Sequence, residues 1–313
     1  MPTLVMTGGT RGLGRAVVDR VLALPDWRII LLARGANPLA GLAPAIASRV
    51  DVVAADLADL RSVQRACRDV RSSLGGDDIA ALALNAGLQS WRKDPVSADG
   101  FELHFEVNHL AHVLIADQLA PHMARGGRIV LTTSGLHDPW AFCIVPITRA
   151  RWQDPNELAD AKLSQARVRG DVNRGEARYC ASKLCNVMHA RALAEQYPDL
   201  AVASFTPGVL PGTDIARDRD ILQHIAWRWL LPVLAPVLPG VRSLARSSGD
   251  LEWLITEAEF QTISGSFFDG RRPSPGSPDS RDKAKVSRLM EVSRSLISHM
   301  LQEEGNAVEG KKH

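Results

Sequence analysis

The stretch Thr3-Leu4-Val5-Met6-Thr7-Gly8-Gly9-Thr10-Arg11-Gly12-Leu13-Gly14 joins a short apolar run to a glycine-rich turn. An apolar stripe with helical spacing follows at residues 16–22. Strand, glycine turn and helix in this order can place the free N–H groups of a helix start against a pyrophosphate. A glycine turn without a ligand shares the pattern, but the flanking elements favour a nucleotide site. The spacing from Gly8 to Gly12 to Gly14 differs from the common Gly-x-Gly-x-x-Gly arrangement.

A second pattern is Tyr179-x-x-x-Lys183, inside the helix-compatible run 178–184. A spacing of four residues puts both side chains on one helix face. We expect the ammonium to lower the phenol pKa from about 10 towards neutrality. Such a tyrosine can give a proton to a carbonyl oxygen or take one from an alcohol. Taken alone, the pair also fits an ordinary surface contact.

With these two patterns, the chain resembles the short-chain dehydrogenases/reductases from about Thr3 to about Phe268. Further marks of that family follow predicted strands in the same order as in the family. They are Asp56-Leu57, Asn85-Ala86-Gly87, Asn108 within Phe105-Glu106-Val107-Asn108-His109, Ser134, and Pro207-Gly208. Each is a common short pattern, but their combination is specific.

The resemblance implies catalytic roles for Asn108, Ser134, Tyr179 and Lys183. In the reductive direction Tyr179 is the acid, Lys183 lowers its pKa and binds the nicotinamide ribose, and Ser134 holds the carbonyl oxygen. Asn108 is expected to hold a water that links Lys183 to solvent. Thr132 and Thr133 are alternatives for the role of Ser134.

The resemblance also implies a cofactor site, and the charges near it indicate NADP(H). Arg34 follows the second predicted strand, where an NAD-selective site usually has a carboxylate for the ribose 2′-hydroxyl. Arg34 and Arg11 can instead bind a 2′-phosphate through charge-assisted hydrogen bonds, although Arg34 could also be a solvated loop residue. The predicted cofactor residues are Gly8, Thr10, Arg11, Gly12, Leu13, Gly14, Arg34, Asp56, Leu57, Asn85, Ala86, Gly87, Tyr179, Lys183, Pro207, Gly208 and Thr213.

The alternation of apolar runs and amphipathic stretches predicts one α/β domain with a doubly wound parallel sheet of about seven strands and helices on both faces, a Rossmann fold. Ligands then bind at the carboxyl ends of the strands. The predicted strands are 3–7, 28–33, 50–55, 79–84, 127–133, 200–206 and 264–268. The predicted helices are 12–24, 59–74, 100–124, 177–197 and 243–258. We divide the chain into a cofactor-binding domain, 1–270, and a C-terminal region, 271–313.

The C-terminal region is expected to contain a loop at 271–280, a helix at 281–303 and a flexible tail. The net charge of +2 without a basic block argues against a nucleic-acid partner. The four cysteines lack metal-ligand spacing, so we expect no metal. Free thiols and an N-terminus that enters a strand at once favour a reduced, cytoplasmic protein. Either a monomer or a homodimer is consistent with the sequence.

Two segments are expected to form the substrate pocket. One is the long interval between Ser134 and Tyr179, and the other is the substrate lid at about 209–241. Within the lid, residues 221–241 are strongly apolar but interrupted by Arg228 and three prolines. This segment is interpreted as a lid, a subunit interface or a peripheral membrane contact. All three interpretations favour a small-molecule substrate with a bulky, lipophilic body.

Within the family, the chain is most similar to the branch of retinol dehydrogenases and light-dependent protochlorophyllide reductases. The similarity rests on residues 97–102 running into 107–112, on Ser182-Lys183-Leu184-Cys185-Asn186, and on residues 282–293. The resemblance implies carbonyl or alcohol chemistry, with protochlorophyllide-type C=C reduction as the alternative. Val209 stands where the pigment reductases have cysteine, which argues against the alternative. A non-catalytic NADP(H) sensor is a third hypothesis, although all four catalytic residues are present.

Overall fold

The fold was analysed in a computed structural model, which describes residues 1–35, 47–140, 148–149, 152–210, 240–259 and 264–309. One sheet contains all eight strands found in these ranges, in the order β3-β2-β1-β4-β5-β6-β7-β8. Every neighbouring pair is parallel except β7 and β8. The strands are β1 (Thr3–Thr7), β2 (Arg28–Ala33), β3 (Val50–Ala54), β4 (Ile79–Leu84), β5 (Met123–Thr132), β6 (Ala201–Thr206), β7 (Ser266–Asp269) and β8 (Arg272–Ser274).

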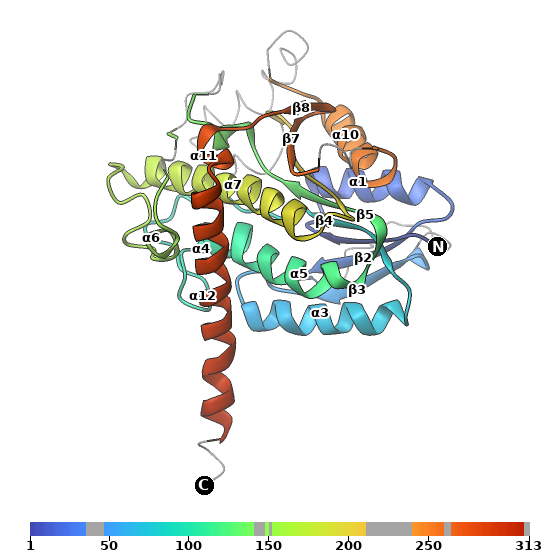
Figure 1. Ribbon diagram of the computed structural model, residues 1–313, viewed down its shortest axis with the longest axis horizontal. Coiled ribbons are helices and arrows are strands. Elements are labelled where there is room, and N and C mark those ends of the chain that lie inside the picture. Colours follow the sequence, from blue (N-terminus) through green and yellow to red (C-terminus); the bar gives the residue numbers. More distant parts are fainter. Residues whose placement is uncertain (36–46, 141–147, 150–151, 211–239, 260–263, 310–313) are drawn as a thin grey trace.

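Helices cover both faces of the sheet (Figure 1). The alternation of side chains along each strand separates two cores: Val5 and Ile30 face one layer, whereas Leu4 and Ile29 face the other. The first layer comprises α3 (Leu60–Leu74), α5 (Ala111–Leu119), α7 (Asp171–Gln196) and α12 (Lys283–Glu309), and the second comprises α1 (Gly12–Ala23) and α10 (Leu244–Thr256). The predicted α/β class, the Rossmann-type sheet and the two-sided cover are confirmed.

The predicted helix 100–124 is wrong as one continuous element. It consists of α4 (Leu103–Phe105), the π-helical turn η1 (Glu106–Leu110), α5 and a 3₁₀ turn, η2 (Ala120–His122). Pro121 lies in this last turn, and β5 begins directly after it, four residues before the predicted start at 127. The π turn places one extra residue in the helix at Asn108.

The predicted loop 271–280 is also wrong. Asp269 and Gly270 (φ +64°) turn the chain so that β8 pairs antiparallel with β7. Pro273 is tolerated there because β8 is an edge strand, where no partner needs its missing N–H. The short helix α11 (Pro278–Arg281) follows.

The terminal helix α12 runs across the first helix layer and extends beyond it towards the C-terminus (Figure 1). It continues to Glu309, six residues past the predicted end at 303. Glutamate and alanine after residue 302 favour helix, which offsets the cost of Gly305. Three further elements complete the described fold: η3 (Gly135–His137), α6 (Pro155–Ala159) and the hairpin turn at Gly270.

The end of β1 is tied to the end of β4 by the Thr7 hydroxyl. Thr7 Oγ1 accepts the backbone N–H groups of Asn85 and Ala86, each at 3.0 Å. Thr3, on the same strand, is equally buried, but its Oγ1 has no partner among the described residues. The two threonines therefore form a matched pair for comparison: the Thr7 hydroxyl has hydrogen-bond partners, and the Thr3 hydroxyl has none among the described residues.

We predict that Thr7→Val destabilises the protein by about 1–3 kcal/mol, because two buried N–H groups lose their acceptor. Thr3→Val should be neutral or stabilising, since its hydroxyl is buried without a partner. Urea denaturation followed by circular dichroism measures both free energies of unfolding. Equal effects of the two substitutions would contradict this account.

Candidate active site

The predicted site residues follow strands that are neighbours in the sheet. Gly8 follows β1, Asn85 follows β4, Ser134 follows β5 and Pro207 follows β6, and these four strands are adjacent and parallel. Their carboxyl ends therefore meet at one edge of the sheet. The fold thus brings together segments that are separated by up to 200 residues in the sequence.

Asn85 links three of these strand ends. Its Nδ2 donates to the carbonyl oxygens of Thr7 and Gly8 at 3.4 and 3.2 Å. Its Oδ1 accepts the Thr132 hydroxyl at 3.0 Å. Asn85 therefore holds the glycine turn against β5. The sequence analysis named Asn85 but missed Thr7 and Thr132 as its partners.

The glycine turn is closely packed at three of its four glycines, Gly8, Gly9 and Gly14. A Cβ at Gly14 would lie 2.0 Å from the Gly8 carbonyl oxygen, and one at Gly8 would lie 2.7 Å from Ala86 Cα. Gly12 begins α1 with φ +55° and has open space around its Cβ position. The N-cap residue Arg11 makes no side-chain capping bond to α1, and the first turn of α1 has no acidic residue. This helix start and the open space at Gly12 suit a phosphate.

Tyr179 and Lys183 lie one turn apart on α7, as predicted. Lys183 Nζ donates to the Thr132 carbonyl oxygen at 3.1 Å and lies 5.6 Å from the centroid of the Tyr179 ring. Both side chains are buried, at 9% exposure for Tyr179 and 3% for Lys183. The ordinary surface pair is therefore excluded.

Burial controls the pKa values of this pair. Loss of water raises the pKa of Tyr179 well above its usual value, while a hydrogen bond with Ser134 lowers it in part. Burial lowers the pKa of Lys183 to about 8. The expected lowering of the Tyr179 pKa by Lys183 is thus not found, because desolvation of the phenolate dominates. A protonated Tyr179 is the form that can donate to a carbonyl oxygen.

Ser134 lies at the start of the short turn η3, with its side chain against Tyr179. Its Oγ accepts Leu136 N–H at 3.2 Å, and its hydroxyl lies close enough to Tyr179 to lower the pKa of the phenol in part. The alternatives Thr132 and Thr133 are both occupied. Thr132 Oγ1 donates to Asn85, and Thr133 Oγ1 donates to the Lys183 carbonyl oxygen at 2.7 Å. Ser134 is therefore the hydroxyl best placed beside Tyr179.

His137 and Thr206 hold the Ser134 loop, and the sequence analysis missed both. His137 Nδ1 lies 2.7 Å from the Ser134 carbonyl oxygen, and its Nε2 lies 3.2 Å from Ser277 N–H. Thr206 Oγ1 accepts Gly135 N–H at 3.0 Å and Gly208 N–H at 3.3 Å. A hydroxyl directly before Pro-Gly was the only sequence signal for Thr206.

Asn108 lies in the π turn η1, with its side chain fully engaged. Its Oδ1 accepts Leu88 N–H at 2.8 Å, and its Nδ2 donates to the Leu88 carbonyl oxygen and to Ser182 Oγ at 3.1 and 2.9 Å. Gly87 keeps space open between Asn108 and Lys183. A Cβ there would lie 3.0 Å from Lys183 Nζ and 3.4 Å from Asn108 Oδ1.

The remaining predicted cofactor residues lie around the same edge. Thr10, Arg11 and Arg34 are exposed, Leu13 is half-buried, and Gly208 has φ +75° beside Pro207. Asp56 Oδ1 accepts Ala58 N–H at 3.1 Å, and Leu57 packs on the core. Thr213, most of the lid at 209–241 and residues 141–147 and 150–151 of the long interval lie outside the described residues.

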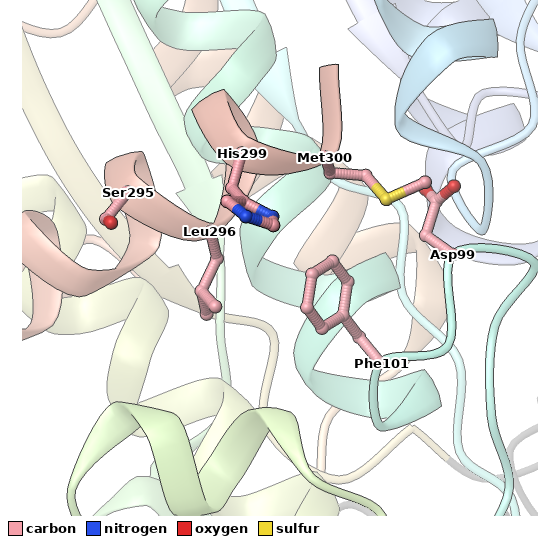
Figure 2. Close-up of a pocket in the computed structure, with 6 residues that line it drawn as sticks. All are labelled: Asp99, Phe101, Ser295, Leu296, His299 and Met300. Carbon is pink, nitrogen blue, oxygen red and sulfur yellow. The ribbon is translucent and has the colours of Figure 1, made fainter. Parts of the chain in front are cut away.

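A pocket of about 360 Å³ lies between α12 and the segment 99–101 (Figure 2). The Met300 side chain reaches towards Asp99 across it. None of the predicted catalytic or cofactor residues lines this pocket, so we do not assign it to the reaction.

Within the described ranges, no helix is long and apolar enough to cross a membrane. The same part of the chain has no group of three or more histidine, cysteine, aspartate or glutamate side chains arranged to hold a metal ion.

Comparison with known proteins places these features in a family. The family model for short chain dehydrogenases matches residues 2–142. The candidate daunorubicin C-13 ketoreductase DnrU of Streptomyces sp. (strain C5) is 30% identical, with 94% of this chain and 92% of that protein covered. The chloroplastic protochlorophyllide reductase of Daucus carota is 25% identical, with 94% and 78% covered.

The fold has close structural counterparts. A short chain dehydrogenase from Burkholderia cenocepacia J2315, solved in complex with NADP, superposes with a TM-score of 0.60 at 22% identity. The alignment covers 86% of this chain and 96% of that structure. At this identity the likeness concerns the fold.

We predict that Lys183→Met stabilises the protein at pH 7, by roughly 1–3 kcal/mol. The Lys183 pKa is about 8 in the folded chain against 10.5 for the free side chain. The unfolded chain therefore binds more protons between these values, and wild-type stability rises with pH across that window. The difference between variant and wild type should shrink towards pH 10.5. Denaturation midpoints from pH 6 to 10.5 test this, with the exposed Lys162→Met as control. A destabilised variant at pH 7 would contradict it.

Proposed function

The chain belongs to the short-chain dehydrogenase/reductase family of oxidoreductases, and from this premise we propose that it uses NADP(H) to reduce or form a carbonyl group. The substrate in this proposal is a small molecule, a ketone, aldehyde or alcohol with a bulky, lipophilic body. One observation carries the proposal: the Lys183 ammonium lies 5.6 Å from the centroid of the Tyr179 ring at the strand ends, with the Ser134 hydroxyl beside the phenol.

The residues present fit a dinucleotide. The uncapped N-terminus of α1 and the open space at Gly12 can receive phosphate, and Gly87 leaves room beside Lys183. The exposed cations Arg11 and Arg34 suit a 2′-phosphate. When bound, NADPH supplies the hydride.

In the reductive direction, Tyr179 donates its proton to the substrate oxygen as negative charge develops there. Its raised pKa keeps that proton in place at neutral pH. Ser134 orients the oxygen, and Lys183 supplies positive charge as long as it is protonated, below a pH of about 8. Asn108 orders the segment at Leu88 and the α7 turn at Ser182. A water held by Asn108 remains part of this proposal.

Two other functions stay open to test. Protochlorophyllide-type C=C reduction is favoured by the relatives of that name, at 25% identity, but Val209 replaces the expected cysteine. A non-catalytic NADP(H) sensor would bind the cofactor without turnover. We also propose that the protein is a cytoplasmic monomer or homodimer. Residues 221–241 are proposed to act as a substrate lid, a subunit interface or a membrane contact.

We predict that Tyr179→Phe lowers turnover by about 10²–10⁴-fold, because the acid is lost. NADPH affinity should stay within about twofold of wild type, since the phenol hydroxyl is only one of many predicted cofactor contacts. NADPH consumption on a panel of lipophilic ketones and aldehydes measures this. The chain contains one other tyrosine, so Tyr197→Phe is the matched control.

The outcomes separate the three hypotheses. Undiminished turnover in Tyr179→Phe would contradict the assigned acid. Pigment reduction that requires light, without ketone turnover, would support the protochlorophyllide alternative. NADPH binding without any turnover would support the sensor.

We predict that Arg34→Glu weakens NADPH binding by about 10–100-fold, because a charge-assisted hydrogen bond to the 2′-phosphate is replaced by repulsion. NADH binding should change little or improve. Fluorescence titration measures both dissociation constants, with Arg68→Glu, an exposed position on α3, as control for net charge. A wild type that prefers NADH would overturn the NADP(H) proposal.

A further inference from the structure

Three fully buried histidines lie beside the catalytic helix. His109 and His112 come from η1 and α5, and His189 comes from α7, all at 0% exposure. His109 and His189 meet edge to face, with ring centroids 5.8 Å apart. Asn186, also at 0% exposure, lies one turn before His189 on α7.

His112 is fully engaged. Its Nε2 lies 3.1 Å from Thr7 Oγ1, and its Nδ1 lies 3.0 Å from the Asn108 carbonyl oxygen. Thr7 Oγ1 already accepts two N–H groups, so its proton points to Nε2 and the ring proton of His112 is on Nδ1. His112 Nδ1–H therefore donates to the Asn108 carbonyl oxygen, which keeps one of its two lone pairs for the proposed water.

The other members of the cluster carry polar atoms without partners. Within the described part of the chain, His109 Nδ1, Asn186 Oδ1 and both ring nitrogens of His189 have no hydrogen bond of ordinary geometry, although Asn186 lies near enough to His109 to raise its pKa in part. Four such atoms in one interior region are unusual, because buried polar groups are normally satisfied by protein or by ordered water. A polar interior site with several such groups is the kind that holds water.

The inner end of this cluster meets Lys183. Lys183 Nζ and Asn186 Nδ2 share the Thr132 carbonyl oxygen, at 3.1 and 3.5 Å. The Lys183 charge also contributes to lowering the pKa of His112. The cluster and the catalytic lysine are thus in one electrostatic environment.

The outer end meets α12. His109 Nε2 lies 2.9 Å from Ser293 Oγ, and the next residue, Arg294, is partly exposed. Arg294 pairs with Asp117 of α5, and its charge reaches His189. The charged and titratable groups that act on His109 and His189 are His112 on the inner side and Arg294, which is paired with Asp117, on the outer side.

We propose that Asn186, His109 and His189 hold ordered water and form a proton route between Lys183 and the α12 face. Its catalytic role rests on the proposed function. Each carbonyl reduction forms a C–H bond from hydride and an O–H bond with the Tyr179 proton. One proton from solvent must then return to Tyr179 through Lys183. A neutral imidazole can accept that proton on one nitrogen and release its own from the other, so no charge is left behind.

The histidines have the protonation state that this role needs. Burial lowers the pKa of His109 to about 3 and that of His189 well below its usual value. Both rings are therefore neutral at the pH of an ordinary assay. Asn186, His109 and His189 do not touch the substrate, so they are positioning residues for the proton.

The kinetic test compares His189→Leu, His189→Gln and the exposed control His122→Leu in ketone reduction with NADPH. If proton return becomes limiting in His189→Leu, kcat falls by about tenfold with KM nearly unchanged. The solvent isotope effect on kcat should rise, and the isotope effect of 4-deuterated NADPH should fall towards one. His189→Gln should lie between His189→Leu and wild type. If kcat falls in His189→Leu and His189→Gln without a change in either isotope effect, His189 has a purely structural role and the proposal is overturned.

A second measurement tests the water without catalysis. In histidine-labelled protein, NMR should show contacts between water and the ring hydrogens of His109 and His189. His189→Leu should lower or leave unchanged the melting temperature, because it removes a satisfied group. If NMR shows no water at His109 and His189 and His189→Leu raises the melting temperature, the proton route is overturned while the proposed function stands. Absence of turnover in wild type would remove the proton demand and overturn the route together with the proposed function.

Discussion

The carboxyl ends of β1, β4 and β5 are joined by hydrogen bonds from side chains, and the candidate site depends on this join. Parallel strands present these ends side by side, but nothing in the sheet itself fixes the loops that follow. Thr7, Asn85 and Thr132 supply that restraint. The glycine turn is pressed against Ala86 as a result, and Lys183 receives its acceptor from Thr132. One polar network therefore positions both the glycine turn and Lys183.

Burial is the second constraint, and it acts on acid and base in opposite directions. It favours the neutral phenol of Tyr179 and weakens the hold of Lys183 on its proton. A buried lysine beside a buried tyrosine is costly for stability, because a charge is kept from water. The protein tolerates that cost at the point where the proposed reaction would place negative charge on a substrate oxygen. Stability and chemistry are therefore in tension at the same two residues.

The sequence predicted the parts of the molecule that depend on local patterns. The first strands, the glycine turn and the Tyr179–Lys183 pair were found because their spacing alone restricts the backbone. Thr206, His137 and the partners of Asn85 were missed because their roles come from contacts between distant segments, which leave no periodic signal. The strand β8 was missed although Asp269-Gly270 is a common hairpin turn, since Pro273 argued for a loop. The break of the helix near Asn108 had no signal in composition.

The terminal helix has a consequence for how the chain is made. Leu289, Met290 and Ile297 of α12 belong to the same core as α5 and α7, and Met300 accepts a hydrogen bond from Arg61 near the start of α3. These residues leave the ribosome after the rest of that layer. Until then, the layer that carries Tyr179 and Lys183 lacks one of its packing surfaces. Domains generally fold as units during synthesis, so this one reaches its final packing only after α12 has been made. A nascent chain that stalls before residue 289 would expose the apolar surface of α5 and of α7, the helix that carries Tyr179 and Lys183.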